Sequence, residues 1–522
     1  MFGCKSRKQA NAIQNACHSK KGADVVKTKH EIVATTAKID HDLQVVGESQ
    51  VCWNPQEAPI CGSQKEEEAL LLVNLKNYDG AIDVYLEILS KYPQNSISNF
   101  DYARICTHLG DLYFIKGDFQ NALKYYRREL GINEESHESY DEPTIADSLM
   151  RIAKTVSATQ QYSYALKLFQ KAFDIRKKVY GIEHAKTIET QLDIAWTYKH
   201  AGMYELSLAQ FYGALGVQQK VYGMCHEELI TTYSSLGKVL LEHGDFDQAL
   251  TCCGKALDIS REMHGNESSH TASAYFNLGR IYFEKGDCDK AIEKLEKSLV
   301  IRKSVFGDTH PKVAISYFHL GIALDKKGDV YDSLQCMKKA ISIDEQTSME
   351  NEAAEKCSKI ASMWAYQKGD YDTALDFLLK SLNLTMKKKK EATNQDTELD
   401  LQLAHRCETI AMVYLLKNNY DMAVNFYRRA YTIRCPIQGS SHKDVLRCCK
   451  SIGDVLLRIK NYDLALFYFG TALDMELKLK TVDRKVILHD YKRMERAFRL
   501  KGDEENANRY LQMTNALEKQ LS

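Results

Sequence analysis

Large apolar and aromatic residues recur along this chain at a fixed distance before a small residue. In the stretches NYDGA, GDFQNA and GDFDQA, an aromatic residue stands three positions before an alanine. The small residue recurs at intervals of 41 to 43 residues, with one longer interval of 49. Its eleven occurrences are Ala81, Ala122, Ala165, Ser207, Ala249, Ala291, Ser333, Ala374, Ala423, Ala465 and Ala507. Self-similarity at a fixed period is typical of a repeat architecture.

Each repeat contains two stretches with helical periodicity. The second stretch opens with the aromatic residue, and a large residue follows the small one after four positions, as Tyr85 follows Ala81. The first stretch carries Leu-Gly or an equivalent, as at Leu278-Gly279. Side chains spaced i, i+4 share one face of a helix, and small residues let two helices approach closely. With only 6 Pro and 27 Gly in 522 residues, the chain is predicted to be all-α, with about eleven helix pairs.

This succession of aromatic, Leu-Gly, Tyr, small and large residues resembles the tetratricopeptide repeat, whose period is 34 residues. The eight additional residues lengthen the second helix and the link after it, as in KAFDIRKKVYGIEHAKT. The links carry Tyr/Phe-Gly-x-x-His at Tyr180, Tyr222 and Phe306, which is similar to the long repeats of kinesin light chains and nephrocystin. The resemblance covers about residues 62–520. It implies a superhelical solenoid whose first helices line a concave groove.

The repeats divide the chain into four segments. Residues 1–60 precede them and are expected to form a basic, flexible arm with at most a short helix. Repeats one to eight are expected over 62–386, and a longer Lys-rich link over 387–400, inside the 49-residue interval. Repeats nine to eleven, ending in a capping helix pair, are expected over 401–522.

The N-terminal arm has the strongest local charge. Its first 30 residues contain seven basic residues and one acidic residue. Such a run is usually a solvated tail, and the alternative is peripheral contact with an anionic membrane or an acidic partner. Lipidation of Cys4 is left open. The heptad positions that follow are too poorly filled to predict a coiled coil.

Composition narrows the function classes. The 70 basic and 70 acidic residues give a net charge of zero, which argues against nucleic acid as a partner. Fifteen cysteines without a CxxC motif favour a reducing, cytoplasmic location, with cytoskeletal association left open. No stretch is apolar enough to predict an integral membrane protein. No nucleotide-binding, zinc-protease or hydrolase motif occurs, so no enzyme, metal site or cofactor is predicted.

Two residue types that could carry chemistry are interpreted structurally. His184, His226, His310 and His442 recur at repeat links, where a histidine can bond exposed backbone groups at a helix start. Cys106, Cys253, Cys288 and Cys407 occupy repeat positions that are expected to be apolar.

The resemblance also implies which residues line the groove. The inward positions of tetratricopeptide repeats fall here on Arg104, His108, Arg151, Lys154, Lys238, Phe276, Asn277, Arg280, Phe318 and His319. Asn277 matches the family asparagine that holds the backbone of a ligand. Arg and Lys side chains could bind acidic residues of a peptide. The alternative for each residue is an ordinary solvated helix face.

The expected function is that of a non-catalytic adaptor or scaffold, which binds peptide segments of partner proteins in the groove. Two narrower versions stay open, namely motor or cargo adaptation and the assembly of signalling, polarity or ciliary complexes. Enzyme regulation, or clustering at a membrane through the basic arm, is the alternative from another class.

Overall fold

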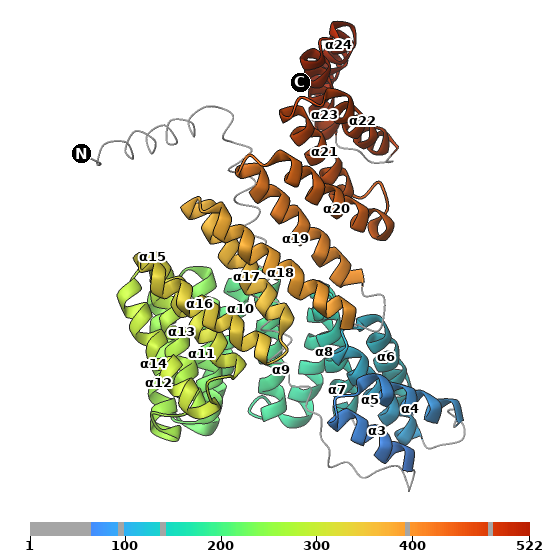
Figure 1. Ribbon diagram of the computed structural model, residues 1–522. Coiled ribbons are helices and arrows are strands. Elements are labelled where there is room, and N and C mark those ends of the chain that lie inside the picture. Colours follow the sequence, from blue (N-terminus) through green and yellow to red (C-terminus); the bar gives the residue numbers. More distant parts are fainter. Residues whose placement is uncertain (1–63, 92–98, 136–141, 392–396, 479–483, 522) are drawn as a thin grey trace, which may run out of the picture. The chain divides into compact units, whose positions relative to one another are not determined.

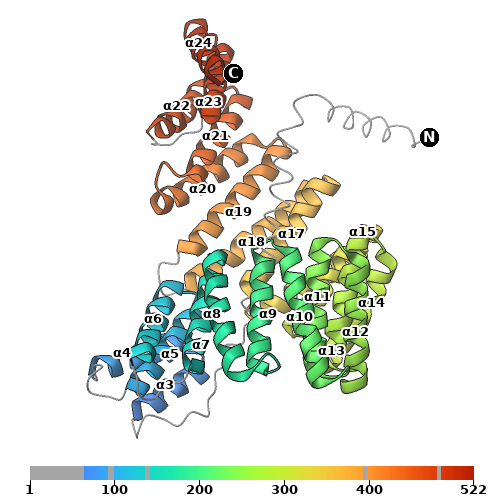
Figure 2. The same cartoon turned by 180° about the vertical axis from the view of Figure 1, so that it is seen from behind.

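The computed structural model describes residues 64–91, 99–135, 142–391, 397–478 and 484–521. The arm expected at residues 1–60 lies outside these ranges. The described residues form helices joined by short turns and links, without a strand (Figure 1 and Figure 2). None of these helices combines the length and apolar character needed to cross a bilayer.

The chain divides into two compact units, Met1–Ile259 and Ser260–Ser522. The first unit contains α3 (Gln64–Asn74), α4 (Tyr78–Lys91), α5 (Asn99–Ile115), α6 (Phe119–Glu135), α7 (Glu142–Ala158), α8 (Tyr162–Tyr180), α9 (Ala185–His200), α10 (Tyr204–Tyr222) and α11 (Glu227–His243). The boundary between the units falls within α12 (Phe246–His264).

The second unit continues the same alternation of first and second helices. It contains α13 (Ser269–Lys285), α14 (Cys288–Phe306), α15 (Pro311–Lys327), α16 (Val330–Gln346), α17 (Glu350–Met363) with the π-helix η1 (Trp364–Lys368), α18 (Tyr371–Glu391), α19 (Thr397–Leu416), α20 (Tyr420–Gln438), α21 (Lys443–Arg458), α22 (Tyr462–Leu477), α23 (Arg484–Lys501) and α24 (Glu504–Leu521).

The second helix of every pair begins three residues before the repeated small residue, as the sequence pattern predicts. The starting residues are Tyr78, Phe119, Tyr162, Tyr204, Phe246, Cys288, Val330, Tyr371, Tyr420, Tyr462 and Glu504. Each of these helices packs against the helix before it, as Cys253 of α12 packs on Gly237 of α11. These eleven helix pairs, counted over the described ranges, confirm the predicted all-α repeat solenoid.

The turn inside each pair uses one residue with a positive φ, two positions before the second helix. These residues are Lys76, Gly117, Gln160, Gly202, Gly244, Gly286, Gly328, Gly369, Asn418, Lys460 and Gly502. Glycine fills seven of the eleven turns because this left-handed conformation costs a residue with a Cβ about 1 kcal/mol or more.

The link between repeats depends on a different glycine. Gly181 has φ 87° and ψ 169°, and Gly307 has φ 84° and ψ 166°, a region that residues other than glycine essentially avoid. This conformation accounts for the glycine of the Tyr/Phe-Gly-x-x-His motif. The histidine of the motif then begins the next first helix.

The link histidines cap helices, as predicted. The Nδ1 atom of His184 accepts a hydrogen bond from the backbone N–H of Lys186 at 3.2 Å, and the ring stacks on Tyr180 with centroids 4.3 Å apart. Equivalent caps begin α11 at His226, α15 at His310 and α21 at His442. Because each imidazole satisfies an exposed backbone donor, the recurrence of histidine has a structural cause.

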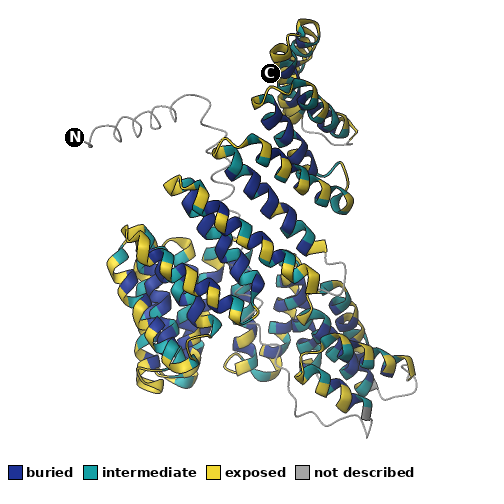
Figure 3. Ribbon diagram, viewed as in Figure 1, coloured by how far each residue is buried: buried dark blue, intermediate teal, exposed yellow. Residues whose placement is uncertain are grey.

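The two helices of a pair touch most closely at the Leu-Gly positions. A Cβ atom at Gly279 would lie 2.7 Å from Cγ of Leu295, and one at Gly453 would lie 2.4 Å from the ring of Phe469. The same relation, over sixteen residues, joins Gly110 to Tyr126, Gly237 to Cys253 and Gly321 to Met337. Buried residues accordingly line the facing sides of the helices (Figure 3).

The Lys-rich link expected at 387–400 is mostly helix. Helix α18 continues through Lys387–Lys390 to Glu391, and α19 begins at Thr397. Lysine is a good helix former, and a cation in the last turn of a helix is favoured by the helix dipole. Ion pairs of Lys387 with Glu350 and of Lys389 with Asp400 add to this. Most of the longer interval therefore extends two helices.

We expect the helix contact in repeat ten to be sensitive to a single methyl group. Gly453→Ala should destabilise the protein by about 1–3 kcal/mol, because the new Cβ overlaps the ring of Phe469. Gly470→Ala, in the same repeat with no atom within 4 Å of the new Cβ, should stabilise by about 1 kcal/mol through helix propensity. Urea unfolding followed by circular dichroism measures both. Equal shifts for the two variants would contradict close packing at Gly453.

Candidate functional site

The residues predicted to bind partners all lie on first helices. Arg104 and His108 lie on α5, Arg151 and Lys154 on α7, and Lys238 on α11. Phe276, Asn277 and Arg280 lie on α13, and Phe318 and His319 on α15. Five of them therefore belong to each unit.

In the first unit, most of the predicted cations are already paired with carboxylates of neighbouring helices. Arg104 lies 3.3 Å from Glu66. Arg151 donates to Glu129 at 2.9 Å. Lys154 lies 3.1 Å from Asp193, and Lys238 is half-buried on α11. These ion pairs connect one repeat to the next, so the charges do not stand open for a ligand.

His108 is enclosed by the same network. Its ring lies 5.5 Å from that of Tyr85, measured between centroids. Burial, and after it the charges of Arg104 and Arg151, lower the pKa of His108 to about 4. The imidazole is therefore neutral near pH 7 and does not act as a cation toward an acidic partner.

The structure shows a set of site residues that the sequence interpretation missed. A polar residue stands eleven positions after the repeated small residue, near the end of the second helix, in nine consecutive repeats. All nine are 6% exposed or less. They are Asn133, Arg176, Gln218, Ser260, Arg302, Asp344, Thr385, Arg434 and Glu476. We call this set the polar ladder; aligning the second helices would have found it.

The ladder residues hydrogen-bond the first helix of the next repeat. Gln218 accepts from the hydroxyl of Thr232 at 2.7 Å. Arg176 donates to the hydroxyl of Thr190 at 2.8 Å and, within its own repeat, to the carboxylate of Asp147 on α7 at 2.6 Å. A buried polar group is costly unless it is bonded, so each joint between repeats depends on a matched pair.

Arg434 has the same kind of partner in repeat nine. Its Nε donates to Glu408 at 2.7 Å, and its Nη1 lies 3.6 Å from Asp444. The two arginines of the ladder at repeats three and nine are thus neutralised by carboxylates of the chain itself.

Arg302 departs from this arrangement. It donates to the carbonyl of Lys312 at 3.0 Å and the hydroxyl of Ser316 at 2.8 Å, and it lies over the ring of Phe276 at 4.4 Å. No carboxylate of a described residue bonds it, because Ser273 stands where Asp147 serves Arg176. Burial alone lowers the pKa of Arg302 to about 10. Repeat six therefore holds a buried cation without an internal counter-ion.

The predicted aromatic residues of the second unit lie near Arg302. Phe276 and Phe318 are buried in the core, 4% and 5% exposed. His319 lies edge-on to Phe276, with centroids 5.0 Å apart. Burial and the charges of Arg280, Arg302 and Lys356 lower the pKa of His319 well below its usual value. The two phenylalanines thus offer a ligand little surface, and their ring positions support Arg302 and His319.

Asn277 is the predicted residue whose bonding capacity is unused. Its side chain is 8% exposed, and its amide hydrogen-bonds no residue that the structure describes. Ser273, Asn277 and Arg280 are spaced i, i+4, i+7 and so share one face of α13. One face of α13 therefore carries the amide of Asn277, the guanidinium of Arg280 and, at Ser273, the position where repeat three has a carboxylate.

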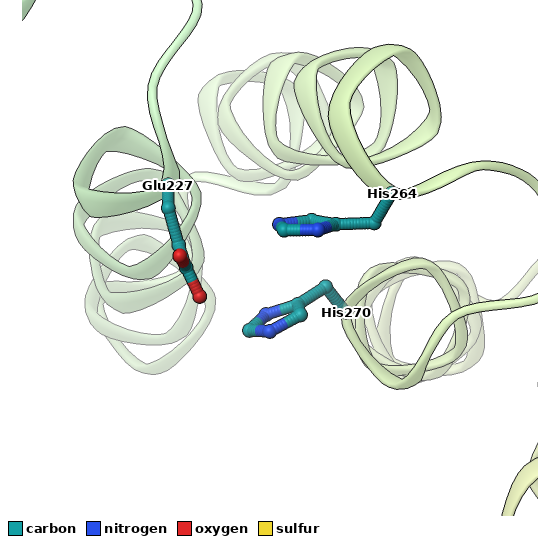
Figure 4. A group of neighbouring side chains, drawn as sticks. All are labelled: Glu227, His264 and His270. Atoms are coloured by element: carbon teal, nitrogen blue, oxygen red, sulfur yellow. The ribbon is translucent and has the colours of Figure 1, made fainter.

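Histidines also meet at the link that begins α13. Figure 4 shows His264 and His270, whose rings stack with centroids 4.8 Å apart. Glu227, also drawn, belongs to the other unit. The pair repeats the stacking seen at the other links.

The cysteines at repeat positions are mainly core residues. Cys106, Cys253 and Cys407 are buried, and Cys288 is half-buried at the start of α14. Burial raises the pKa of Cys106 to about 12 and that of Cys407 to about 11. Their thiols are therefore protonated and poor nucleophiles near neutral pH.

Models of the tetratricopeptide repeat match more than half of the chain. One matches residues 144–220, 198–262, 228–299 and 270–346. A second matches 103–136 and 404–434, and a third matches 68–95. No curated protein sequence is significantly similar to the chain.

Several solved structures resemble parts of the chain. RapI in its apo form is 18% identical, with a TM-score of 0.40, over 55% of this chain and 98% of RapI. BtubC from P. vanneervenii is 20% identical, with a TM-score of 0.38, over 47% and 94%. A Podosopora anserina protein described as a kinesin light chain, with nearly identical TPR-like repeats, is 18% identical, with a TM-score of 0.36, over 40% and 100%.

The polar ladder can be tested at the Gln218 joint. Thr232→Val should destabilise the protein by about 1–3 kcal/mol, because the buried amide of Gln218 loses its partner. Thr231→Val, at an exposed position beside it, should change stability by about 0.5 kcal/mol or less. Combining Gln218→Met with Thr232→Val should recover most of the loss. Thermal unfolding measures all three, and equal effects of the two threonine variants would contradict the ladder.

The buried imidazole of His108 should make stability depend on pH. Since its folded pKa is lowered from 6.5 to about 4, its contribution is complete above about pH 6.5 and is lost as the pH falls toward 4. The loss should reach about 2 kcal/mol at pH 5. His108→Gln should lack this part of the pH dependence in urea unfolding between pH 5 and 7.5. If the imidazole signal of His108 itself, identified by its loss in His108→Gln, titrates near pH 6.5 in the folded protein, the burial argument is wrong.

Proposed function

This chain belongs to the tetratricopeptide repeat family, and from that premise we propose that it is a non-catalytic adaptor that binds peptide segments of partner proteins. The repeats place their first helices in succession, which suits an extended or helical peptide. The binding face is that of α13 in repeat six. It consists of Ser273, Asn277 and Arg280, with Arg302 behind them.

The observation that carries this proposal is the missing counter-ion of Arg302. At the equivalent position in repeat three, Asp147 bonds Arg176 at 2.6 Å. A carboxylate supplied by a peptide would complete the same bond at repeat six, at the place that Ser273 leaves to solvent. Charge-assisted bonds to arginine are among the stronger ones, contributing about 1.5–3 kcal/mol.

Asn277 supplies the second contact. An asparagine amide can donate to and accept from one peptide backbone unit at the same time. Its position four residues after Ser273 would hold the backbone of the peptide beside the carboxylate that Arg302 receives. The peptide class is therefore one with an Asp or Glu side chain next to a backbone segment that Asn277 can bond.

The first unit is a less suitable binding face. Arg104, Arg151 and Lys154 are bonded to carboxylates of the chain itself, so an acidic peptide would have to displace Glu66, Glu129 or Asp193. Recognition is therefore centred on repeat six and not spread over all the predicted groove residues.

We propose further that the protein is not an enzyme and that it is cytoplasmic. The link histidines 184, 226, 310 and 442 are engaged as helix caps. The eleven described cysteines are free thiols, which suits a reducing compartment. The alternative, motor or membrane clustering through the basic arm, depends on residues outside the described ranges.

A variant that restores the internal counter-ion tests the site. Ser273→Asp should bond Arg302 as Asp147 bonds Arg176, which would stabilise the fold and block the peptide carboxylate. Peptides selected on the intact chain from a displayed random library should contain acidic residues. Their affinity, measured by fluorescence anisotropy, should fall about tenfold or more with Ser273→Asp.

Ser273→Asn is the matched control, since it has the same shape without the charge and should change affinity about twofold or less. Asn277→Ala should weaken the same peptides. A library that yields no binding peptide would overturn the proposed function. Unchanged affinity with Ser273→Asp would overturn only the contact to Arg302.

A further inference from the structure

The joint between repeats ten and eleven contains two buried carboxylates and one lysine. Glu476, the ladder residue of α22, is 5% exposed, and Asp490 of α23 is 3% exposed. Lys450 of α21 places its Nζ atom 2.7 Å from Oε1 of Glu476 and 2.7 Å from Oδ2 of Asp490. One cation therefore bridges two acidic groups from two further helices.

Elsewhere in the ladder, a charged ladder residue lies beside a residue of opposite charge. Arg176 pairs with Asp147, and Asp344 pairs with Lys356. At the last joint a second cation, Arg493, donates to Asp490 at 3.1 Å. Its side chain is 24% exposed and is also directed to Asp454 of α21, 3.6 Å away.

Glu476 thus depends on a lysine that it shares. Its second oxygen, Oε2, is buried and accepts no hydrogen bond from a described residue. Burial first, and then the neighbouring Asp490, raise the pKa of Glu476 to about 7, while Lys450 acts in the opposite direction. A proton between the two carboxyl groups would satisfy the buried oxygen and remove the repulsion between like charges.

The helix pair attached through this joint has few fully buried residues. Only Asp490, Met494 and Ala497 of α23 are buried, and only Ala507 and Thr514 of α24. Met494 and Ala497 join a core with Phe469 and Leu473 of α22. Segments with few buried apolar residues open at low free-energy cost. A change of charge at the joint is therefore a large part of the free energy that holds α23 and α24 in place.

We propose that a proton shared by Glu476 and Asp490 holds the last helix pair on repeat ten, and that losing this proton loosens α23 and α24. Lys450 from α21 and Arg493 from α23 pair with Asp490, and Asp454 of α21, which lies beside Arg493, also feels the charge of His489 from α23. None of these replaces the proton at Oε2 of Glu476. The last repeat is thereby a pH-responsive end of the solenoid, whatever partner the other repeats bind.

The sign of the effect follows from the protonation of the two states. The docked state keeps a proton that an opened, solvated Glu476 releases above about pH 4.5. Docking is therefore strongest at low pH in this respect, weakens as the pH rises toward 7, and is constant above about pH 8. Between pH 6 and 8 the opening equilibrium constant should increase about tenfold.

Hydrogen exchange of the full chain, followed by mass spectrometry at pH 6, 7 and 8 and corrected for intrinsic exchange, tests this proposal. In the unaltered protein, protection should fall about tenfold in α23 and α24, and α13 and α14 should keep theirs. This comparison needs no variant. A constant protection of α23 and α24 across the three pH values would overturn the proposal.

Variants then identify the carboxyl group. Glu476→Gln mimics the protonated form and should keep α23 and α24 as protected at pH 8 as the unaltered protein is at pH 6. Glu495→Gln is the matched control, because Glu495 pairs on the same helix with the exposed Arg499, and it should retain the tenfold change. A tenfold change that persists in Glu476→Gln would show that another group binds the proton.

Discussion

The close approach of two helices within each pair is the constraint on which the rest of the structure depends. At Gly279 and Gly453 the helix surface lacks a side chain, and Leu295 and Phe469 of the second helix fill the space. Because a large residue then lies directly on a backbone, the angle and register of each pair are set by a contact of one atom's width. A pair packed in this way still exposes one apolar face, which only the next pair can bury.

Apolar contact between repeats does not by itself specify which pair follows which. The polar ladder adds that information, because Gln218 matches Thr232 and Arg176 matches Thr190, each on the first helix of the next repeat. A mismatched neighbour would leave a buried amide or guanidinium without a partner, at a cost of about 1–3 kcal/mol or more. The repeats are therefore alike in their backbone and distinct in their joints.

Both proposed activities arise where the ladder residue and its partners differ from the pairing seen in repeat three. In repeat six the scaffold keeps the arginine at 302 and has Ser273 in place of the carboxylate, which transfers the need for an anion to a partner. In repeat ten the ladder residue, Glu476, is itself acidic and shares Lys450 with a second acid, Asp490. In our proposal a proton supplies the positive charge that this joint lacks. Both repeats keep the close contact inside the helix pair, at Gly279 and at Gly453, while the chemistry of the joint that follows differs.

The sequence by itself determined the number of helix pairs, the start of each second helix and the capping histidines, because these depend on residues close together in the chain. Tyr78 and Ala81 mark a helix start within one turn, and His184 caps its own helix. The ion pair of Lys387 at the end of α18 joins it to Glu350, 37 residues away, a contact that the local sequence does not contain. Which inward residues are open was decided only by the tertiary structure. Arg104 is paired with Glu66, and Phe276 is buried beneath Arg302. These contacts join side chains that are far apart in the sequence, and a periodic pattern does not say which of them meet.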